Sequence, residues 1–276
     1  MPFPESQPSR ELALSDQTGV AATWGQYGAA YDDTFTAVNH EVARIALERS
    51  ALEPGMAVLD IASGGGALSI PAARMGARVL ATDLSPVMLE RLRERASGEG
   101  LDIRTEIMDG TDLAVGKQPF DRVCSEFGVM FFPGTGLPEM HRVMAPGGKA
   151  IVIIWGYPED VPLTLYRVAI ERALGAEAMR PEVPLVRDPR GLEPALREAG
   201  FGDVDLFTHT ESIPATSGED LWRWMSGASP GYATFVASQS DDQRARIREA
   251  SLSATDERYG STFRSLPMEM ICAVAS

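Results

Sequence analysis

Residues 58–66 read Val-Leu-Asp-Ile-Ala-Ser-Gly-Gly-Gly, a short apolar run that carries one acid and ends in three glycines. This order predicts a strand, a tight turn and the start of a helix, because glycine permits the backbone conformations that such a turn needs. Glycines also let the backbone approach a ligand closely, and a helix N-terminus offers unpaired N–H groups with positive dipole character. We therefore expect a nucleotide-like cofactor to bind at this turn.

Strands and helices are predicted to alternate on both sides of this turn. Pro54-Gly55 ends a helix before the first strand, and Ser85-Pro86 is a strong helix start, because serine caps the first turn and proline suits the first helical position. The strands are short, apolar and mostly without alternation, which is typical of a parallel sheet covered on both faces. We expect strands over residues 57–61, 78–82, 102–108, 121–126, 149–155, 201–211 and 266–275, and helices over 36–50, 67–75, 86–98, 137–144, 161–174, 188–199, 218–225 and 241–259.

The length and composition allow one large core with helical additions. A chain of 276 residues with 44% hydrophobic residues can bury such a core. The expected organisation is a mobile tail at residues 1–18, an N-terminal cap segment and cofactor-binding core at 19–155, lid helices at 156–187, core again at 188–215, a helical lid at 216–263 and the last core strand at 264–276.

The charge and the cysteines exclude several classes of function. A net charge of −14 argues against nucleic acid and anionic membrane surfaces as partners. Cys124 and Cys272 lie in apolar runs and are expected to be buried thiols, so neither a disulfide nor a metal site is predicted. Residues 1–15 do not resemble a targeting signal, and the longest strongly apolar run, 150–155, is too short to span a bilayer. We expect a cytoplasmic protein that is a monomer or a homodimer.

An acid stands at the end of each of the first three predicted strands. These acids are Asp60, Asp83 and Asp109. Ligands of parallel α/β sheets bind outside the carboxyl ends of the strands. Asp83 is therefore expected to accept hydrogen bonds from the two hydroxyls of a ribose, and Asp109 to hold an adenine amino group.

Two other cofactor classes fit the turn less well. A nicotinamide site needs Gly-x-Gly-x-x-Gly, but Ser69 stands at the third glycine. A phosphate-binding loop needs a lysine, and this turn has none. An acid directly before the turn would repel a pyrophosphate, whereas it favours a ligand with an amino group and a positive charge. S-adenosylmethionine is such a ligand.

The chain resembles the class I S-adenosylmethionine-dependent methyltransferases. Residues 60–66 match their first motif, Asp-x-Gly/Ala-x-Gly-x-Gly, and Asp83-Leu84-Ser85 matches the ribose-binding acid and the residues after it. Residues 108–110, 120–125 and 141–148 match the later motifs, and the run 127–133 is similar to small-molecule enzymes of the ubiquinone/menaquinone-biosynthesis type. The resemblance implies an α/β fold with a Rossmann-like, seven-stranded, mostly parallel sheet, an antiparallel last strand and a helical lid.

The same resemblance implies the residues of the cofactor site and S-adenosylmethionine as the cofactor. The expected cofactor-binding residues are Tyr27, Asp60, Ala62, Ser63, Gly64, Gly66, Asp83, Leu84, Met88, Met108, Asp109, Gly110, Ser125 and Glu126.

The partner is expected to be a small-molecule methyl acceptor, held under aromatic side chains. Methyl transfer is an in-line displacement, so the enzyme mainly aligns the reactants and excludes water, and a base helps only where the acceptor must lose a proton. The candidate catalytic residues are Tyr31, Glu126 and His209. The expected pocket residues are Trp24, Tyr27, Phe127, Met130, Phe131, Trp222, Met225, Tyr232 and Phe235.

The predicted function is the transfer of a methyl group to a small apolar or aromatic metabolite, of the kind found in secondary metabolism. One alternative is a non-catalytic protein that binds an adenosine ligand on the same fold. A nicotinamide oxidoreductase is a further alternative, which Ser69 disfavours.

Overall fold

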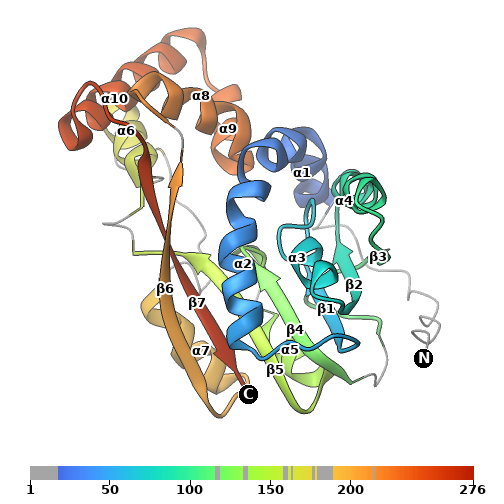
Figure 1. The fold of residues 1–276 in the computed structure, drawn as a ribbon. Coiled ribbons are helices and arrows are strands. Elements are labelled where there is room, and N and C mark those ends of the chain that lie inside the picture. Colours follow the sequence, from blue (N-terminus) through green and yellow to red (C-terminus); the bar gives the residue numbers. More distant parts are fainter. Residues whose placement is uncertain are drawn as a thin grey trace.

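A computed structural model of the chain describes residues 18–115, 119–132, 136–157, 161–162, 164–175, 178, 189–213 and 215–276. These residues form one seven-stranded sheet with the order β3-β2-β1-β4-β5-β7-β6 (Figure 1). Strands β1 to β5 run parallel, and β7 lies antiparallel between β5 and β6. This arrangement confirms the predicted sheet. The strands are β1 (Ala57–Ile61), β2 (Arg78–Asp83), β3 (Ile103–Ile107), β4 (Phe120–Glu126), β5 (Met144–Trp155), β6 (Val204–Ile213) and β7 (Leu266–Ala275).

The central strands are buried on both faces, as their unbroken apolar runs predict. Every residue of β1 is buried, and residues 150–154 of β5 are completely inaccessible to solvent. The edge strands β3 and β6 are only partly buried. The carboxyl ends of β1, β2 and β4 therefore meet in the interior of the sheet, where a ligand can be surrounded on several sides.

Helices cover both faces of the sheet. Figure 1 shows α2 crossing one face, while α5 and α7 lie against the other. The N-terminus of α4 is capped as predicted, because the Ser85 hydroxyl accepts a hydrogen bond from the Met88 N–H at 3.4 Å. Helix α3 begins only at Ser69, which places Pro71 in the first turn, where proline is tolerated. These helices are α2 (Ala37–Arg49), α3 (Ser69–Arg74), α4 (Pro86–Gly98), α5 (Leu137–Val143) and α7 (Leu192–Glu198), with short 3₁₀ turns η2 (Val129–Phe131) and η3 (Pro189–Gly191).

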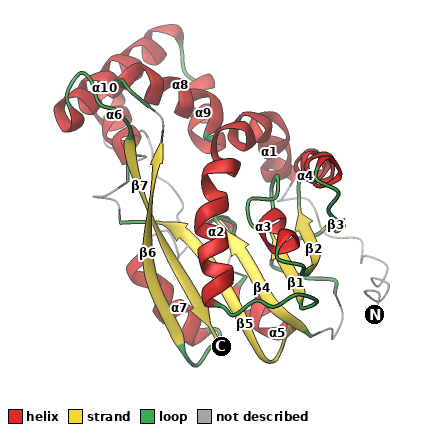
Figure 2. Cartoon of the chain, viewed as in Figure 1, coloured by secondary structure: helices red, strands yellow, loops and turns green. Residues whose placement is uncertain are grey.

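Four helices gather beyond one end of the sheet, and we call them the helical cluster (Figure 2). Helix α10 packs on α6, α8 and α9, and the Tyr166 hydroxyl of α6 donates to the Leu221 carbonyl of α8 at 3.0 Å. The helical cluster comprises α6 (Thr164–Leu174), α8 (Gly218–Ala228), α9 (Pro230–Ala237) and α10 (Asp241–Tyr259). Of these, α6 falls within the predicted segment 156–187 and the others within 216–263, while residues 1–17 of the predicted tail and much of 156–187 lie outside the described residues.

A helix that the sequence analysis did not assign precedes α2. Helix α1 (Thr18–Tyr31) continues into a short π-helix, η1 (Asp32–Thr36), and then into α2. Glycines make the intrinsic helix propensity of α1 low, so its stability comes from packing on α4, α8 and α9. Gly28 allows this packing, because a Cβ atom there would lie only 2.5 Å from the sulfur of Met88 on α4.

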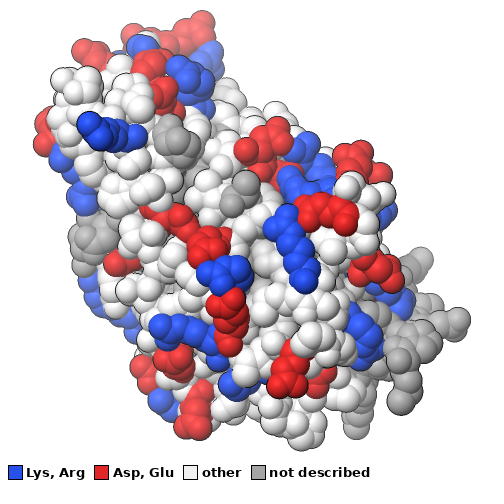
Figure 3. Space-filling view, viewed as in Figure 1, with Lys and Arg blue, Asp and Glu red and all other residues white. Residues whose placement is uncertain are grey.

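Acidic and basic side chains are interspersed on the face of the molecule in Figure 3, and the described residues form no broad basic patch on it. None of the described helices has the length and hydropathy needed to cross a bilayer.

Arg122 joins β4 to the end of α2, and its loss is expected to destabilise the fold. The buried guanidinium donates to the Ser50 hydroxyl at 3.0 Å and to the carbonyls of Ser50 and Ala51 at 2.6 and 2.7 Å. Arg122→Met would leave these acceptors unpaired, which should lower the free energy of unfolding in urea by about 2–4 kcal/mol. The control Arg167→Met removes an exposed arginine and should change that free energy by less than about 0.5 kcal/mol. Equal unfolding midpoints for the two variants would contradict this role.

Candidate active site

A cavity of about 210 Å³ lies at the carboxyl ends of β1, β2 and β4. The glycine turn after β1 and the ends of these strands form its floor, and residues of α1, η1 and α2 form one wall. The cavity therefore lies where strand order and the predicted motifs place a ligand site.

The glycine turn adopts the backbone conformation that its sequence predicts. Gly64 and Gly66 have φ angles of 53° and 96°, in the left-handed region that favours glycine. The Asp83 carboxylate holds the turn, accepting hydrogen bonds from the Gly64 N–H at 2.9 Å and the Ser85 N–H at 2.8 Å. Burial raises the pKa of Asp83, although the backbone N–H groups of Ser85, Gly64 and Leu84 oppose the shift. Asp83 thus connects the turn to α4 and also lines the cavity.

Asp60, at the end of β1, is buried with one carboxylate oxygen unsatisfied. Its Oδ2 accepts a hydrogen bond from the Ser69 hydroxyl at 2.6 Å, while no described group is bonded to Oδ1. The pKa of Asp60 is raised to about 7, mainly by burial and also by the nearby charge of Asp83, while the Ser69 hydrogen bond opposes the rise. Ser69, which disfavoured a nicotinamide site in the sequence, thus orients the acid of the first motif.

Glu126, the last residue of β4, is the least satisfied charged group of the cavity. It is buried, and neither carboxylate oxygen has a hydrogen-bond partner among the described residues. Burial, and then the charge of Asp60, raise its pKa well above the usual value for glutamate. A buried carboxyl without partners is destabilising, and Glu126 lies where a ligand in the cavity would satisfy it.

Tyr31 and Asn39 bring polar groups from the N-terminal wall to the same cavity. Burial, and then the charge of Glu126, raise the pKa of Tyr31, while a hydrogen bond with Asn39 acts in the opposite direction. The Oδ1 atom of Asn39 is buried without a described partner.

Aromatic rings form much of the remaining wall. Trp24 of α1 meets Tyr31 edge-on, with ring centroids 5.2 Å apart, and meets Phe131 of η2 at 5.8 Å. Phe127 stacks on Trp155 at 3.9 Å and has a positive φ of 57°. The rings of α1 and η2 thus approach each other beside the cavity, which suits an apolar or aromatic ligand.

Most residues predicted for the site line this cavity. The lining includes the predicted residues Trp24, Tyr31, Asp60, Ala62, Ser63, Gly64, Asp83, Leu84, Met88, Met108, Gly110, Glu126, Phe127 and Phe131. The other predicted residues, which the lining does not include, are Tyr27, Gly66, Asp109, Ser125, Met130, His209, Trp222, Met225, Tyr232 and Phe235.

Asp109, predicted to hold an adenine amino group, is not among the residues that line the cavity. Its Oδ1 accepts hydrogen bonds from both the N–H and the hydroxyl of Thr111, each at 2.8 Å. Aspartate commonly bonds the backbone two residues further along, and this local turn directs one oxygen into its own loop. The neighbouring residues Met108 and Gly110, rather than the Asp109 carboxylate, line the cavity. Two of the three strand-end acids therefore face the ligand site.

Two aromatic residues predicted from the C-terminal segment, Trp222 and Tyr232, pack within the helical cluster. The Tyr232 ring packs on Tyr166 at 4.5 Å and on Trp222 at 6.2 Å, and its hydroxyl bonds to Ser251 at 3.4 Å. Met225 is also buried, and Phe235 packs against the hydrophobic core. The helices of the cluster therefore use these large apolar side chains to pack against one another.

His209 lies on the edge strand β6, away from the cavity. Its Nε2 is 2.7 Å from Oε1 of Glu211 on the same strand. Both β7 and β5 separate β6 from β4, whose last residue is Glu126. Of the three candidate catalytic residues, Tyr31 and Glu126 line the cavity and His209 does not.

Two polar residues of the wall, Thr36 and Asn39, were not predicted from the sequence. Both are buried, and both line the cavity beside Tyr31. They lie three positions apart in the helix predicted at 36–50, so they share one face of that helix beside its apolar stripe. This polar pair at helical spacing was the signal that could have indicated a polar cavity wall. Apolar spacing alone did not distinguish this pair from exposed residues.

The fold and the site define a class I, Rossmann-like methyltransferase architecture. The family described as "Methyltransferase domain" matches residues 58–148. The chain is 33% identical to a demethylmenaquinone methyltransferase of Clavibacter sepedonicus over 225 residues, which cover 73% of this chain and 90% of that protein. It is 31% identical to a ubiquinone/menaquinone biosynthesis C-methyltransferase of Bordetella parapertussis, covering 71% and 84%. The chain belongs to the S-adenosylmethionine-dependent methyltransferase family.

Other similarities are shorter or are restricted to the fold. An uncharacterized protein of Mycobacterium tuberculosis is 38% identical over 147 residues, which are 52% of this chain and about half of that relative, 53% of its length. The phosphoethanolamine N-methyltransferase 2 of Haemonchus contortus, solved with S-adenosyl-L-methionine, superposes with a TM-score of 0.51 at 18% identity, covering 86% of this chain and 52% of that one. The [4+2]-cyclase SpnF superposes at 0.54 and 18% identity, covering 86% and 81%. The fold is therefore shared by proteins with different reactions.

Proposed function

We propose that this protein transfers a methyl group from S-adenosylmethionine to a small acceptor bound in the cavity. The observation that carries the proposal is the pair of buried carboxyls, Asp60 and Glu126, whose unsatisfied oxygens lie beside the glycine turn. A positively charged, hydrogen-bonding ligand would satisfy them, and S-adenosylmethionine carries a sulfonium and an amino group.

The residues present fit this cofactor. Asp83 would hold its ribose, the backbone from Ala62 to Gly64 would surround its amino-acid part, and Asp60 would face its positive charges. When bound, the cofactor supplies a methyl group on a positively charged sulfur, which departs as a neutral thioether. The protein does not have to protonate a leaving group, so its main tasks are alignment and the exclusion of water.

The acceptor that we propose is small, apolar or aromatic, and not anionic. Three carboxyls line the cavity, those of Asp60, Asp83 and Glu126, whereas none of the described lining residues is a lysine, arginine or histidine. An acceptor with a phosphate or carboxylate would meet repulsion without compensation there. The rings of Trp24, Phe127 and Phe131 supply an apolar surface instead. The quinone-related names of the relatives from Clavibacter and Bordetella agree with this class of acceptor.

We assign to Glu126 the proton that the acceptor loses as its oxygen, nitrogen or carbon takes the methyl group. The carboxylate is free to accept a proton because its two oxygens lack partners in the described chain. A base works best when its pKa is near the working pH, and burial moves the pKa of Glu126 in that direction. Tyr31 keeps its proton because its pKa is raised, and it serves as a donor on the opposite wall.

The test is to incubate the protein with S-adenosylmethionine carrying a labelled methyl group and a metabolite extract, and then to follow the label by mass spectrometry. We expect one or a few apolar metabolites to gain one methyl group each. Heat-denatured protein is the control and should give no labelled product. Cofactor binding without any labelled product would instead support a non-catalytic protein on the same fold.

A further inference from the structure

Asp32 is a buried acid at a position where the backbone departs from an ordinary α-helix. It begins η1, the π-helical turn between α1 and α2, and its side chain is completely inaccessible to solvent. π-helical turns are rare and are frequent at functional sites. Neither the methyl transfer nor the cofactor contacts described above use this carboxylate.

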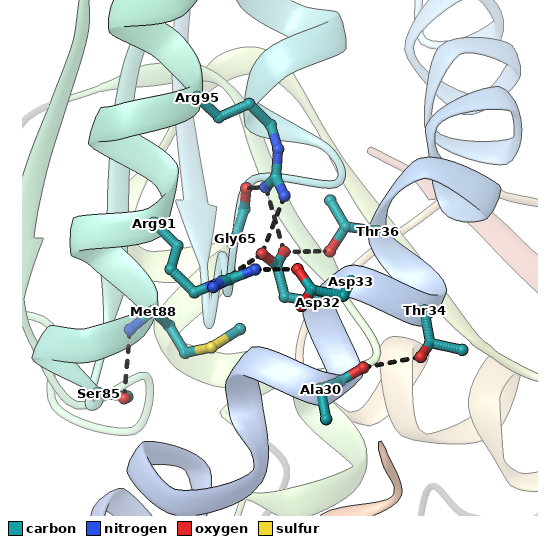
Figure 4. A network of polar contacts seen from close by, with 10 residues as sticks. All are labelled: Ala30, Asp32, Asp33, Thr34, Thr36, Gly65, Ser85, Met88, Arg91 and Arg95. Carbon is teal, nitrogen blue, oxygen red and sulfur yellow. Dashed lines mark hydrogen bonds and ion pairs between the residues drawn. The ribbon is translucent and has the colours of Figure 1, made fainter. Parts of the chain in front are cut away.

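Three side chains converge on the Asp32 carboxylate (Figure 4). Arg91 donates to Oδ2 at 2.6 Å, Arg95 donates to Oδ2 at 2.9 Å and to Oδ1 at 3.1 Å, and the Thr36 hydroxyl donates to Oδ1 at 2.5 Å. Burial alone would raise the pKa of Asp32, but hydrogen bonds from Arg95, Thr36 and Arg91 outweigh burial and hold the pKa below its usual value. The carboxylate is therefore ionised and links η1 to two successive turns of α4.

The same carboxylate lies directly against the glycine turn. A Cβ atom added to Gly65 would lie 1.7 Å from Oδ1 of Asp32 and 2.9 Å from Nη1 of Arg95. Arg95 also donates a hydrogen bond to the Gly65 carbonyl. Figure 4 shows the Arg95 guanidinium bonded to both the Gly65 carbonyl and the Asp32 carboxylate. Gly65 is thus small because the acid of the N-terminal segment occupies the place of a side chain.

The residues on both sides of Asp32 belong to the cavity. Tyr31 precedes it, Thr36 ends η1 and donates to it, and both line the cavity. Trp24, which comes earlier in α1, completes the aromatic wall. Any displacement of Asp32 from α4 would therefore move this wall away from the glycine turn.

We propose that Asp32 is a positioning residue that docks α1 and η1 on the glycine turn and thereby builds the wall of the cofactor cavity. The expected effect of Asp32 on cofactor binding rests on the proposed function, whereas the docking of α1 and η1 is a property of the protein without any ligand. Because the wall comes from a segment of low intrinsic helix propensity, its position depends on this contact more than on the helix itself.

The first test compares Asp32→Asn with Asp33→Asn. Both variants remove one negative charge, but Asp33 is exposed and contacts Arg91 only at the surface. In the ligand-free protein, Asp32→Asn should speed hydrogen exchange of backbone amides in residues 18–36 at least ten-fold and leave β1 and β4 unchanged. The same variant should raise the Kd for S-adenosylmethionine at least ten-fold in calorimetry. Asp33→Asn should do neither.

The second test is a double-mutant cycle that combines substitutions of Asp32 and Gly65. Gly65→Ala should weaken cofactor binding at least ten-fold in the unchanged protein, because the new methyl group displaces the carboxylate. In an Asp32→Ser background the same change should weaken binding less than three-fold. An equal loss in both backgrounds would mean that the methyl group acts on the cofactor directly, and it would overturn the proposal.

The two proposals fail in different ways. An unchanged protein that binds no S-adenosylmethionine would contradict the function, while faster exchange of residues 18–36 in Asp32→Asn would still establish the docking. Exchange and Kd that are both unchanged in Asp32→Asn would overturn the positioning role. A lower melting temperature with an unchanged Kd would reduce Asp32 to a structural residue and would also overturn it.

Discussion

Replacing Asp83 by alanine is expected to remove nearly all of the thermal stabilisation of this protein by S-adenosylmethionine. Asp83 holds the Gly64 and Ser85 N–H groups at 2.9 and 2.8 Å and presents its carboxylate to the cavity. The variant loses both the ribose contact and the support of the turn, so we expect affinity to fall at least 100-fold.

The size of the effect follows from linkage. Cofactor at 100 times its Kd stabilises a folded protein by about 2.7 kcal/mol, whereas cofactor at its Kd adds only about 0.4 kcal/mol. For a chain of this length these values correspond to melting-temperature shifts of about 5–10 °C and about 1 °C. Scanning calorimetry or dye fluorescence at one fixed cofactor concentration measures the melting-temperature shift of the unchanged protein and of the variant.

The matched control for this prediction is Asp102→Ala. Asp102 is an exposed acid before β3, outside the cavity, and its loss changes the net charge by the same amount. This control should retain the full shift. A full shift in Asp83→Ala as well would refute the assignment of the ribose site.

Replacing Glu126 by glutamine is expected to lower turnover by about 10²–10⁴-fold, the usual contribution of a positioned general base. Glutamine keeps the size of the side chain but cannot take up a proton. The Kd for the cofactor should change far less than the turnover, because Asp60, Asp83 and the glycine turn remain and glutamine keeps a hydrogen-bonding group at this position. Rapid-quench measurement of label transfer to the acceptor separates the two quantities.

The pH dependence gives a second, independent signature of Glu126. Its raised pKa places the acid limb of the rate profile well above pH 4.5, with activity rising as the carboxyl ionises. The glutamine variant should lack this limb. The exposed Glu198→Gln serves as the control and should keep the profile of the unchanged protein. A limb that persists in the Glu126 variant would exclude this residue as the base.

Glu126→Gln, which lowers activity, should leave the folded protein equally stable or more stable. Because the folded-state pKa of Glu126 lies above its unfolded value, the folded protein binds the proton more tightly, and this contribution to stability is lost as pH rises through the folded pKa. Glu126→Gln should therefore unfold at the same or a higher temperature than the unchanged protein at neutral and alkaline pH. Such a gain is typical of active-site groups that are retained for function.

Much of the fold could be predicted because its signals are local. Ser85-Pro86 begins α4 as expected, and β1 occupies the predicted residues 57–61. Unbroken apolar runs separated by helices indicate a mainly parallel sheet, because the strands of such a sheet are covered by helices on both faces. The acids at the carboxyl ends of β1 and β2, Asp60 and Asp83, then lie at one edge of the sheet by topology alone.

The direction of individual side chains could not be predicted in the same way. Asp109 stands at a strand end like Asp60 and Asp83, yet its carboxylate bonds to Thr111 in its own loop. Tyr232 and Trp222 have the composition of a ligand pocket, yet they pack into the helical cluster. The contacts of these side chains depend on which groups are nearest in space, and the spacing of residues along the chain does not show which groups those are.

The amino-acid sequence by itself determined the sheet, the glycine turn and the acids that flank it, because backbone conformation and strand burial respond to neighbouring residues. Only the tertiary structure decided that α1 and η1 close one side of the cavity, since Asp32 meets Arg91 and Arg95 across about 60 residues of chain. The isolation of Glu126 was likewise decided in three dimensions, because a lack of partners is a property of everything packed around a group.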